Sequence, residues 1–502
     1  MPVQLPLIIP QKDQADLIQE VFSHENVCPQ QERIALERKY APLLKQTDKF
    51  SRKLVSYQGN KGEVIHGWIQ YKEGFSSQLV EILIRRFGIQ PGDTILDPFS
   101  GSATTLLVAK FLGINAFGIE ILPLCHLAWE AKSHVLDYDL QELRQVYQQL
   151  TQSVPNKASE QFPHIVITET AFPPETENDI MFYTQWFENL AISDPARTLC
   201  RLVVTSILGE VSYTRKDGQY LRWDYRSEKI RSRNDTKISL GKEPIKKVDK
   251  GPLPSVKEAL LRSLKGILSD IEKFQQIQSR KSHQEDSQQK LIQGNTLTVL
   301  PALAADQFSG VITSPPYCNR YDYTRIYALE IAYLQRGQDI RELRQNQLSC
   351  TVESHSKLNI LQKCYQSLGQ QDNYDKILNT VQNHPVFTEI NDALQARWQR
   401  GDMNNKGVLS MVEQYFTELT FVFAELFRTC RSGAHVAFVN DNVRYGGEVI
   451  PVDLLSTSLA ENLGFEPVTV YVLPQRKGNS SQQMERFGRQ ALRKSITVWK
   501  KP

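Results

Sequence analysis

The stretch Gly92-Asp-Thr-Ile-Leu-Asp-Pro-Phe-Ser-Gly-Ser-Ala-Thr-Thr105 predicts a buried strand, a turn that contains glycine, and a helix that continues to about Leu112. Asp97 closes the strand at its carboxyl end, where open α/β sheets bind their ligands, and its carboxylate suits an ammonium group. Gly101 lets a ligand approach the backbone closely. The phosphate fingerprint G-x-G-x-x-G is absent from this turn, which disfavours a dinucleotide. The stretch therefore indicates an α/β fold with a nucleotide-like ligand at the turn.

The segments on either side extend this pattern. Residues 116–120 predict the next strand, and Glu120 at its end is an acid able to accept hydrogen bonds from both hydroxyls of a ribose. Upstream, residues 78–87 predict an amphipathic helix with Ser76 or Ser77 as its N-cap. The start of a helix offers backbone N–H groups to a carboxylate. Both segments therefore belong with the Asp97 turn in one predicted ligand site.

A second motif, Ser314-Pro315-Pro316-Tyr317, follows the apolar run 310–313. An amino group on an aromatic base is a poor nucleophile because its lone pair is delocalised into the ring. The Ser314 hydroxyl and the Pro315 carbonyl can each accept one of its N–H groups. Pro316 stiffens the turn by fixing φ, and Tyr317 offers a face on which a base can stack. The tetrapeptide therefore predicts a site that grips the exocyclic amino group of a nucleic-acid base.

Residues 291–295 predict a short strand that leads through a helix to the strand before Ser314, and Asn295 at its end could read an adenine edge. Each segment taken alone is also compatible with an ordinary βα turn, which needs Gly, Ser and Asp for backbone reasons. The tetrapeptide alone is compatible with a Pro-Pro turn that ends a sheet ladder. The occurrence of all these segments in one chain favours the ligand site.

Composition sets the broad class. The chain has 502 residues, 40% of them hydrophobic and 23% charged, with a formal net charge of +3, so nucleic-acid binding requires a local basic surface. The longest apolar runs fall short of the roughly 18 residues that span a bilayer, and residues 1–10 lack the basic start of a signal peptide. The seven cysteines form no Cys-x-x-Cys pair, which argues against zinc and disulfides. We expect a cytoplasmic globular protein without a metal site or membrane contact.

These residues resemble those of the S-adenosylmethionine-dependent, amino-methylating DNA methyltransferases. Residues 97–105 resemble the cofactor motif of that family, and Ser314-Pro-Pro-Tyr317 resembles the catalytic motif of its cytosine-N4 branch. The resemblance covers roughly residues 60–140 and 290–502. One departure is Ala103, where the usual cofactor motif has glycine. Another is the order of the parts, because the cofactor half comes first and the catalytic half follows an insertion of about 150 residues.

The resemblance implies the roles of individual residues. S-adenosylmethionine is the implied cofactor, and the residues implied to bind it are Phe75, Ser76, Asp97, Pro98, Phe99, Gly101, Ser102, Thr104, Glu120 and Asn295. Phe75 and Ser76 would contact the methionine end, Glu120 the ribose and Asn295 the adenine. The implied catalytic residues are Ser314, Pro315, Pro316 and Tyr317.

The resemblance also implies the architecture, a Rossmann-like α/β fold with a mostly parallel seven-stranded sheet, helices on both faces and an antiparallel last hairpin. The carboxyl-terminal third fits, with helices predicted at 412–429 and 451–463 and strands at 434–439, 467–472 and 495–499. The predicted parts are an N-terminal extension (1–60), a cofactor half (61–140), an inserted region (141–290) and a catalytic half (291–502). The polar stretch 338–405 predicts a mobile loop system over the site.

Residues 211–250 form a local basic stretch. They contain twelve Lys or Arg and six Asp or Glu, a local charge of +6 in a chain whose total is +3. Cations and aromatic residues alternate here, which suits contacts to phosphates, sugars and bases. The residues that we expect to contact DNA are Arg215, Lys216, Arg222, Trp223 and Arg226. A solvated hairpin with charge on one face is the alternative.

Together these patterns predict a site-specific DNA methyltransferase that modifies the amino group of a base flipped out of double-stranded DNA, with cytosine N4 favoured by Ser314. Adenine N6, guanine N2 of RNA, and a non-catalytic DNA-binding protein on the same scaffold remain open. Intact Asp97, Glu120 and Ser314 oppose the last. Attack at cytosine C5 by Cys318 is disfavoured, because this cysteine follows Tyr317 rather than a single proline. Any linked restriction endonuclease would be a separate protein.

Overall fold

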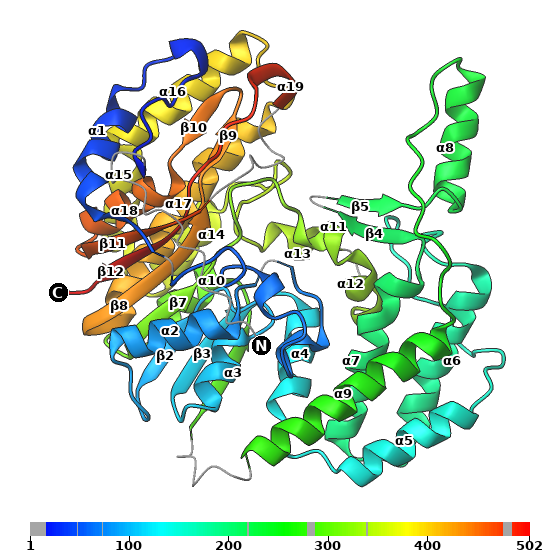
Figure 1. Cartoon of the computed structure of the whole chain (residues 1–502). Helices are drawn as coiled ribbons and strands as arrows, with labels where there is room; N and C mark the ends of the chain where they lie inside the picture. Colours follow the sequence, from blue (N-terminus) through cyan, green and yellow to red (C-terminus); the bar gives the residue numbers. More distant parts are fainter. Residues whose placement is uncertain are drawn as a thin grey trace, which may run out of the picture.

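A computed structural model describes residues 17–47, 49–72, 74–217, 220–278, 287–337, 340–474 and 484–502. Its centre is an eight-stranded sheet with the strand order β1-β11-β12-β8-β7-β2-β3-β6 (Figure 1). The strands are β1 (Leu44–Gln46), β2 (Thr94–Asp97), β3 (Asn115–Glu120), β6 (Gln289–Gln293), β7 (Phe308–Thr313), β8 (Cys430–Asp441), β11 (Glu466–Leu473) and β12 (Lys494–Lys500). Neighbouring strands are parallel except at β12, which runs antiparallel to both β8 and β11.

The predicted α/β class is therefore confirmed, and the antiparallel pair at the end of the chain is β11 with β12. The sheet has one strand more than the predicted seven. This additional strand, β1, comes from the N-terminal extension, which is described from residue 17 onward, and Leu44 pairs in parallel register with Val470. Three residues of edge pairing carry too weak a pattern to be recognised in the sequence.

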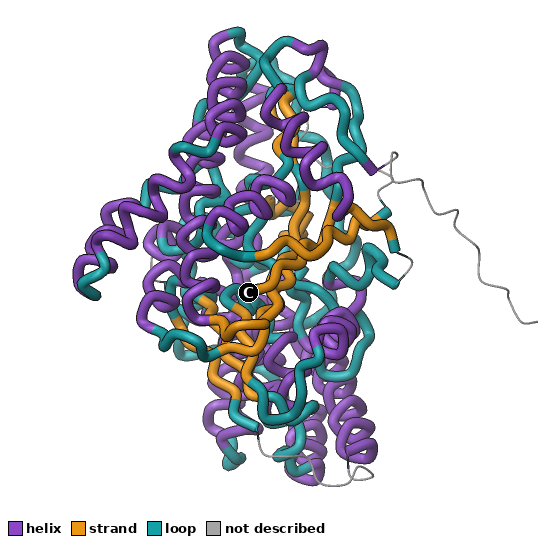
Figure 2. The backbone as a smooth tube through the Cα atoms, turned by 90° about the vertical axis from the view of Figure 1, so that its left-hand side faces the viewer, coloured by secondary structure: helices purple, strands orange, loops and turns teal. Residues whose placement is uncertain are grey.

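The sheet is buried on both faces, as its apolar strands require. Successive side chains of β7 point to opposite faces: Ile312 packs with α2 (Ser77–Phe87) and α3 (Thr104–Lys110), whereas Val311 packs with α17 (Gly407–Thr429) and α18 (Val452–Asn462). Figure 2 shows the strands running through the middle of the molecule with helices on both sides. The predicted helix 412–429 thus belongs to the longer α17.

The inserted region is mainly helical. Its elements are α5 (Leu140–Gln152), α6 (Pro174–Asn189), α7 (Asp194–Val211), the hairpin of β4 (Thr214–Asp217) and β5 (Tyr220–Trp223), α8 (Glu228–Ser239) and α9 (Val256–Gln278). Helices α5, α6, α7 and α9 share one buried cluster with α4 (Pro123–Ser133) and α12 (Ala328–Leu334), which lie outside the predicted insertion. The insertion therefore has no core separate from the rest of the chain within the described residues.

The stretch 338–405, for which the sequence predicts a mobile loop system, is instead largely helical, although residues 338 and 339 lie outside the described ranges. It contains α13 (Ile340–Gln345), α14 (Leu358–Ser367), α15 (Gln371–Gln382) and α16 (Pro385–Gln399). These helices have apolar stripes: Leu361 and Tyr365 of α14 and Val381 of α15 are buried in the cluster that includes α17. Because the stretch is polar in its overall composition, these apolar stripes were not recognised in the sequence.

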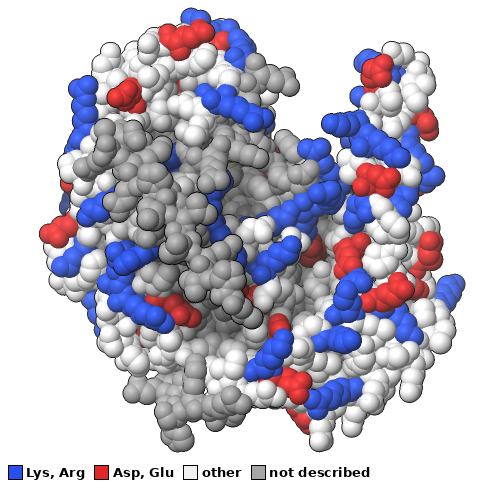
Figure 3. Space-filling model, viewed as in Figure 1, with Lys and Arg blue, Asp and Glu red and all other residues white. Residues whose placement is uncertain are grey.

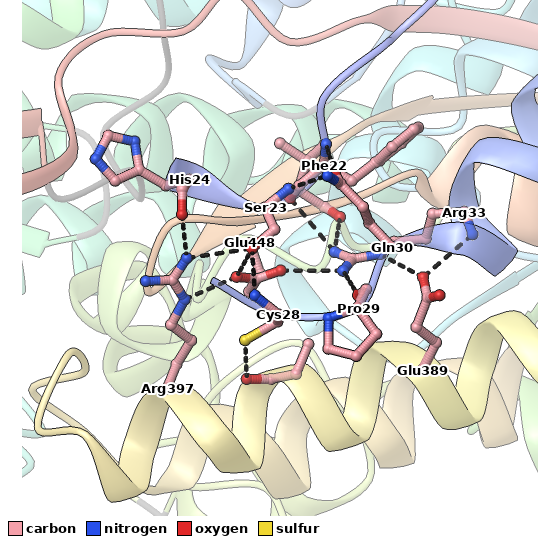
Figure 4. A network of polar contacts seen from close by, with 12 residues as sticks. Phe22, Ser23, His24, Cys28, Pro29, Gln30, Arg33, Glu389, Arg397 and Glu448 are labelled. Carbon is pink, nitrogen blue, oxygen red and sulfur yellow. Dashed lines mark hydrogen bonds and ion pairs between the residues drawn. The ribbon is translucent and has the colours of Figure 1, made fainter. Parts of the chain in front are cut away.

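A buried ionic network ties the N-terminal extension to the catalytic half (Figure 4). The Arg33 guanidinium of α1 (Gln31–Tyr40) lies 2.9 Å from the Glu389 carboxylate of α16 and 3.0 Å from that of Glu448, which begins β10 (Glu448–Ile450). Arg397 of α16 lies 2.7 Å from the second Glu448 oxygen and donates to the His24 carbonyl at 2.7 Å. Every guanidinium nitrogen of both arginines has an acceptor, as a charge buried in the interior requires.

The remaining short elements are β9 (Val443–Tyr445), α10 (Thr296–Val299), α11 (Tyr323–Ile326) and α19 (Met484–Phe487). Across the described ranges of the chain, none of the helices is both long enough and apolar enough to cross a membrane.

Candidate active site

A pocket of about 780 Å3, part of it open to solvent, lies where β2, β3, β6 and β7 reach their carboxyl ends. Ten residues predicted for the site line it: Phe75, Pro98, Phe99, Gly101, Ser102, Thr104, Glu120, Asn295, Ser314 and Pro316. Four others, Ser76, Asp97, Pro315 and Tyr317, are sequence neighbours of the lining residues but do not belong to the lining itself. The fold thus brings the two predicted half-sites, far apart in the sequence, to one cavity.

The turn after β2 is held from within by Asp97. Its carboxylate accepts hydrogen bonds from the hydroxyls of Thr105 at 2.7 Å and Thr313 at 2.8 Å, and thereby joins the end of β2 to the start of α3 and the end of β7. Burial raises the pKa of Asp97 to about 6, although these hydroxyls oppose the rise. Ala103 has φ 61° and ψ 35°, the left-handed conformation that glycine adopts without strain, so alanine strains the turn.

Glu120 lines the pocket at the end of β3 with its carboxylate fixed in place. Its oxygens accept backbone N–H groups from Gly101 at 2.8 Å, Ile121 at 2.8 Å and Leu122 at 2.9 Å. Burial raises the pKa of Glu120, and the three N–H groups oppose that rise. A carboxylate has about four lone-pair sites, so one remains for a hydroxyl donor from a ligand, and not the two that the sequence predicts for a ribose.

Helix α2 begins beside the pocket, and its first turn is already capped. Ser76 is the N-cap, and its hydroxyl accepts the Leu79 N–H at 3.2 Å, which confirms one of the two predicted caps. The Ser77 N–H is taken by the Asn60 side chain at 3.0 Å. These two backbone N–H groups are therefore already hydrogen-bonded within the protein. The direct contact to the pocket from this segment comes from Phe75.

Asn295 presents its amide to the pocket from the N-cap position of α10. Its side-chain oxygen accepts the Leu297 N–H at 3.0 Å, which orients the NH2 group away from the helix. An amide NH2 can donate to the ring nitrogens of an adenine, so the geometry suits the implied role.

The tetrapeptide turn leaves β7 beside the same pocket. The Ser314 hydroxyl is 3.2 Å from the Tyr317 hydroxyl and 3.3 Å from the Val439 carbonyl oxygen, and it can donate to either. Because its single proton is used in this way, its remaining lone pairs are available to accept N–H groups.

A buried lysine supports Tyr317 from the neighbouring strands. Lys494 Nζ donates to the Tyr317 hydroxyl at 3.2 Å, lies 4.7 Å from the centroid of its ring and forms an ion pair with Asp441 at 3.0 Å. Burial lowers the pKa of Lys494, but Asp441 and Tyr317 outweigh this effect and raise it above its ordinary value. Lys494 is therefore charged, and it fixes the hydroxyl end of the Tyr317 ring.

Sequence reasoning missed an aromatic wall and a polar edge of the pocket. Tyr71 stacks on Tyr327 with centroids 5.2 Å apart, and both Tyr71 and Tyr323 line the pocket. Residues 346–348 line it as well, from the chain after α13. The spacing of Tyr323 and Tyr327 by four residues, which places them on one face of a helix, could have indicated the aromatic wall. No sequence pattern marks residues 346–348 as part of the pocket.

The residues predicted to contact DNA divide into two groups. Lys216 forms an ion pair with Glu330 and lies over the Tyr327 ring, and Arg226 is bound to Asp224 at 2.7 Å. These two cations are engaged within the protein. The exposed members are Arg215 and Arg222, and Trp223 is half-buried on the same hairpin.

The sheet with one antiparallel strand and the pocket at its carboxyl edge define a methyltransferase-type α/β protein. A family model described as DNA methylase matches residues 17–128. The chain is 56% identical over 483 residues to Type II methyltransferase M.BsoBI of Geobacillus stearothermophilus, covering 96% of this chain and 94% of that protein. It is 37% identical over 477 residues to Type II methyltransferase M.AvaI of Nostoc sp., covering 93% of each chain. It therefore belongs to the amino-methylating family of Type II DNA methyltransferases, whose methyl donor is S-adenosylmethionine.

The residues of the pocket fit this cofactor. The donor has a ribose diol, an adenine and a charged amino acid end, and the pocket offers the Glu120 carboxylate, the Asn295 amide and the rings of Phe75 and Phe99. The fixed carboxylate with one free lone-pair site and the amide oriented by its own N-cap bond are each complementary to such a nucleoside.

Proposed function

We propose that this protein methylates the N4 amino group of cytosine in double-stranded DNA, on a base turned out of the duplex into the pocket beside Ser314. The observation that carries the proposal is that Ser314 and Pro316 line the same cavity as Glu120 and Asn295. Ser314 can accept an N–H of the target base and Glu120 can bind the ribose of the methyl donor, so both reactants can bind in one pocket.

The proposed chemistry depends mainly on positioning. Ser314 accepts one N–H of the target amine and the Pro315 carbonyl accepts the other, which draws the nitrogen lone pair out of the ring. Tyr317 offers its face to the base, with its hydroxyl held by Lys494. The bound S-adenosylmethionine supplies an electrophilic methyl group on sulfur. The methyl group would pass to the amine nitrogen with S-adenosylhomocysteine as the leaving group, and the released N–H proton would go to solvent. Bringing two bound reactants into line can lower the barrier by about 7 kcal/mol or more, so a strong general base is not needed.

The remaining residues have supporting roles in this proposal. Glu120 accepts from the ribose, Asn295 donates to the adenine, and Phe75 and Phe99 pack against the nucleoside or methionine part. Asp97 holds the turn that carries Gly101, Ser102 and Thr104, and Ser76 caps α2 behind Phe75. Region 141–290 serves as the target-recognition region, with Arg215, Arg222 and Trp223 at the DNA. Lys216 joins the hairpin to Glu330, and Arg226 pairs with Asp224 directly after the hairpin. A separate cognate endonuclease would complete a restriction–modification pair.

The base that is modified can be identified directly. The purified protein is incubated with S-adenosylmethionine and double-stranded DNA, the DNA is digested to nucleosides, and methylated nucleosides are separated by mass spectrometry. We expect N4-methylcytosine. Accumulation of N6-methyladenine instead would overturn the cytosine assignment and keep the amino-methylating class, because the amino chemistry is the same for both bases.

Ser314→Ala tests the amino-gripping role. Loss of one positioned polar contact at a reacting centre costs about 100-fold in turnover, and we expect kcat to fall by about this factor while the dissociation constant of the cofactor changes less than about twofold. Ser309→Ala on the same strand is the matched control, since its hydroxyl is bonded to Asp93 at 2.9 Å and is absent from the pocket lining. Equal activity of Ser314→Ala and the wild type would remove Ser314 from the mechanism.

A further inference from the structure

Helix α8 projects from the molecule as an arm, at the upper right of Figure 1. Of its twelve residues, all of which the structure describes, Ile230 alone is buried. The far end leaves Ile238 61% and Leu240 63% exposed. A helix that is polar on nearly all sides gains little from packing, so its projection as an ordered arm points to a binding partner.

The charges on α8 indicate the chemistry of that partner. Lys229, Arg233 and Lys237 are spaced by four residues and form one stripe along the helix. Like charges at this spacing repel one another. Burial and the neighbouring Arg233 lower the pKa of Lys229, which is consistent with this repulsion. Arg233 is exposed and has no acidic partner among the described residues. Lys237 Nζ donates to the Glu243 backbone carbonyl at 3.2 Å, a neutral acceptor that leaves its charge uncompensated. The stripe is thus unfavourable alone and favourable against a polyanion.

The arm is placed beside the predicted DNA-contacting hairpin. Figure 3 shows Lys and Arg side chains gathered over the hairpin β4–β5 and the base of the arm, next to a notch between the arm and the rest of the upper part of the molecule. Lys229 lies 4.3 Å from the centroid of the Trp223 ring, which joins the stripe to β5. Lys216 and Arg226 are paired inside the protein, whereas α8 carries four cations and two acids, which is +2 of the +6 in residues 211–250.

We propose that α8 lies along double-stranded DNA with the stripe of Lys229, Arg233 and Lys237 against the phosphate backbone. The stripe is about 12 Å long, because four residues of helix rise about 6 Å. One strand of B-DNA presents about three phosphates over that length, so each cation can neutralise one of them. The inference rests on the proposed DNA-methylating function and adds α8 to the hairpin as a part of the DNA-binding surface.

The salt dependence of DNA binding tests the arm. Binding of the full-length protein to a duplex of random sequence is measured by fluorescence anisotropy over a range of NaCl concentrations. Each lost phosphate contact lowers the magnitude of the slope of log K against log [salt] by about 0.9. We expect this change for Arg233→Ala and a change of about 2.7 for the triple variant Lys229→Ala/Arg233→Ala/Lys237→Ala. Affinity near 0.1 M salt should fall about eightfold for the single variant.

Lys265→Ala, which removes an exposed cation from α9, is the matched control and should keep the wild-type slope. Cofactor affinity and melting temperature report whether each variant is folded. An unchanged slope in the triple variant, a loss of affinity without a slope change, or a change in the oligomeric state of the free protein would each overturn the proposal. If α8 does not contact DNA, the nucleoside that the wild type methylates is still the one proposed. If the wild type methylates a different base, the salt dependence still tests α8. The two proposals can therefore fail independently.

Discussion

At the scale of single residues, Asp97 is charged at neutral pH although its environment favours the protonated form. Its folded pKa is about 6, against an ordinary value of 3.8, because burial outweighs the hydrogen bonds that it accepts. At a pH between these two pKa values, Asp97 keeps its proton in the folded state and has lost it in the unfolded state. Stability therefore falls as pH rises through this window, by about 3 kcal/mol in total.

Asp97→Asn should remove this dependence, since the amide keeps the size of the side chain and carries no charge. We expect the stability of the variant relative to the wild type to increase from pH 4 to pH 7, as measured by urea unfolding at several pH values. Parallel stability curves for the two proteins would contradict the assignment of the window to Asp97.

Lys494 acts through Tyr317 and is a positioning residue rather than a catalytic one. Lys494→Met removes the hydrogen bond to the Tyr317 hydroxyl, and hydrogen bonds to charged groups contribute about 1.5 kcal/mol or more, so kcat should fall about tenfold. Cofactor affinity should stay the same, because Lys494 does not line the pocket. Steady-state kinetics and calorimetry with the cofactor separate the two effects.

The single variant leaves the Asp441 carboxylate without its cation, so a control must separate stability from positioning. The double variant Lys494→Met/Asp441→Asn has no unpaired charge and should recover most of the lost stability. Its turnover should remain low. Wild-type turnover in the double variant would show that Lys494 only stabilises the fold.

Residues whose role is set by a short stretch of neighbouring sequence could be predicted, and residues whose role depends on distant contacts could not. Pocket lining by Gly101, Glu120 and Ser314 was predicted because each lies at a strand end, where a short motif specifies both the turn and the chemistry. Lys494 could not be predicted, since it meets Tyr317 across 177 residues of sequence and its own surroundings are an ordinary strand. Asp97 was predicted at the turn, but its choice of the hydroxyls of Thr105 and Thr313 depends on tertiary contacts.

At the scale of elements, the ionic network around Glu448 fastens α1 and α16 to β10 (Figure 4). Glu448 receives both Arg33 and Arg397, and the side chains of all three are at most 2% exposed. Removing one partner of a buried ion pair leaves an uncompensated charge and costs about 3–5 kcal/mol. Glu448→Gln should therefore lower the free energy of unfolding by about this amount, as measured by urea denaturation.

A surface ion pair provides the comparison. Glu81 and Arg85 of α2 are 3.2 Å apart with side chains 44% and 77% exposed, and exposed pairs contribute about 1 kcal/mol or less. Glu81→Gln should therefore change stability by less than about 1 kcal/mol. Similar small losses in both variants would mean that the buried network does not hold the N-terminal extension in place.

The elements that the sequence pattern predicted are those with a clear period. The strands at 94–97 and 434–439 and the amphipathic helix α2 have apolar runs or stripes that local reasoning detects. Strand β1 and helices α13–α16 were missed because their few apolar residues are diluted by polar ones, and pairing with β11 or packing on α17 decides their structure. The hairpin β4–β5 was recognised as a candidate, but the contacts of Lys216 and Arg226 to Glu330 and Asp224 were not.

At the scale of the whole molecule, the inserted region and the cofactor half are joined by one core. Its buried residues include Leu124 and Ala128 from α4, Leu199 from α7, Leu260 from α9 and Leu329 from α12. Strand β3 ends at Glu120 and β6 begins at Gln289, so the stretch between them lies outside the sheet, and it has no core of its own within the described residues. Elements that share a core unfold together, so we infer a single cooperative unit.

Thermal unfolding tests this inference through the cofactor site. The pocket is built from segments on both sides of the insertion, including Tyr71, Asn295 and residues 346–348, so a bound ligand stabilises all of them at once. A ligand at 100 times its dissociation constant adds about 2.7 kcal/mol to the free energy of unfolding, which for a chain of this length corresponds to about 2–3 °C in melting temperature. Calorimetry with S-adenosylhomocysteine should show one transition that moves as a whole. Two transitions, of which the ligand moves only one, would mean that the insertion folds independently despite its shared core.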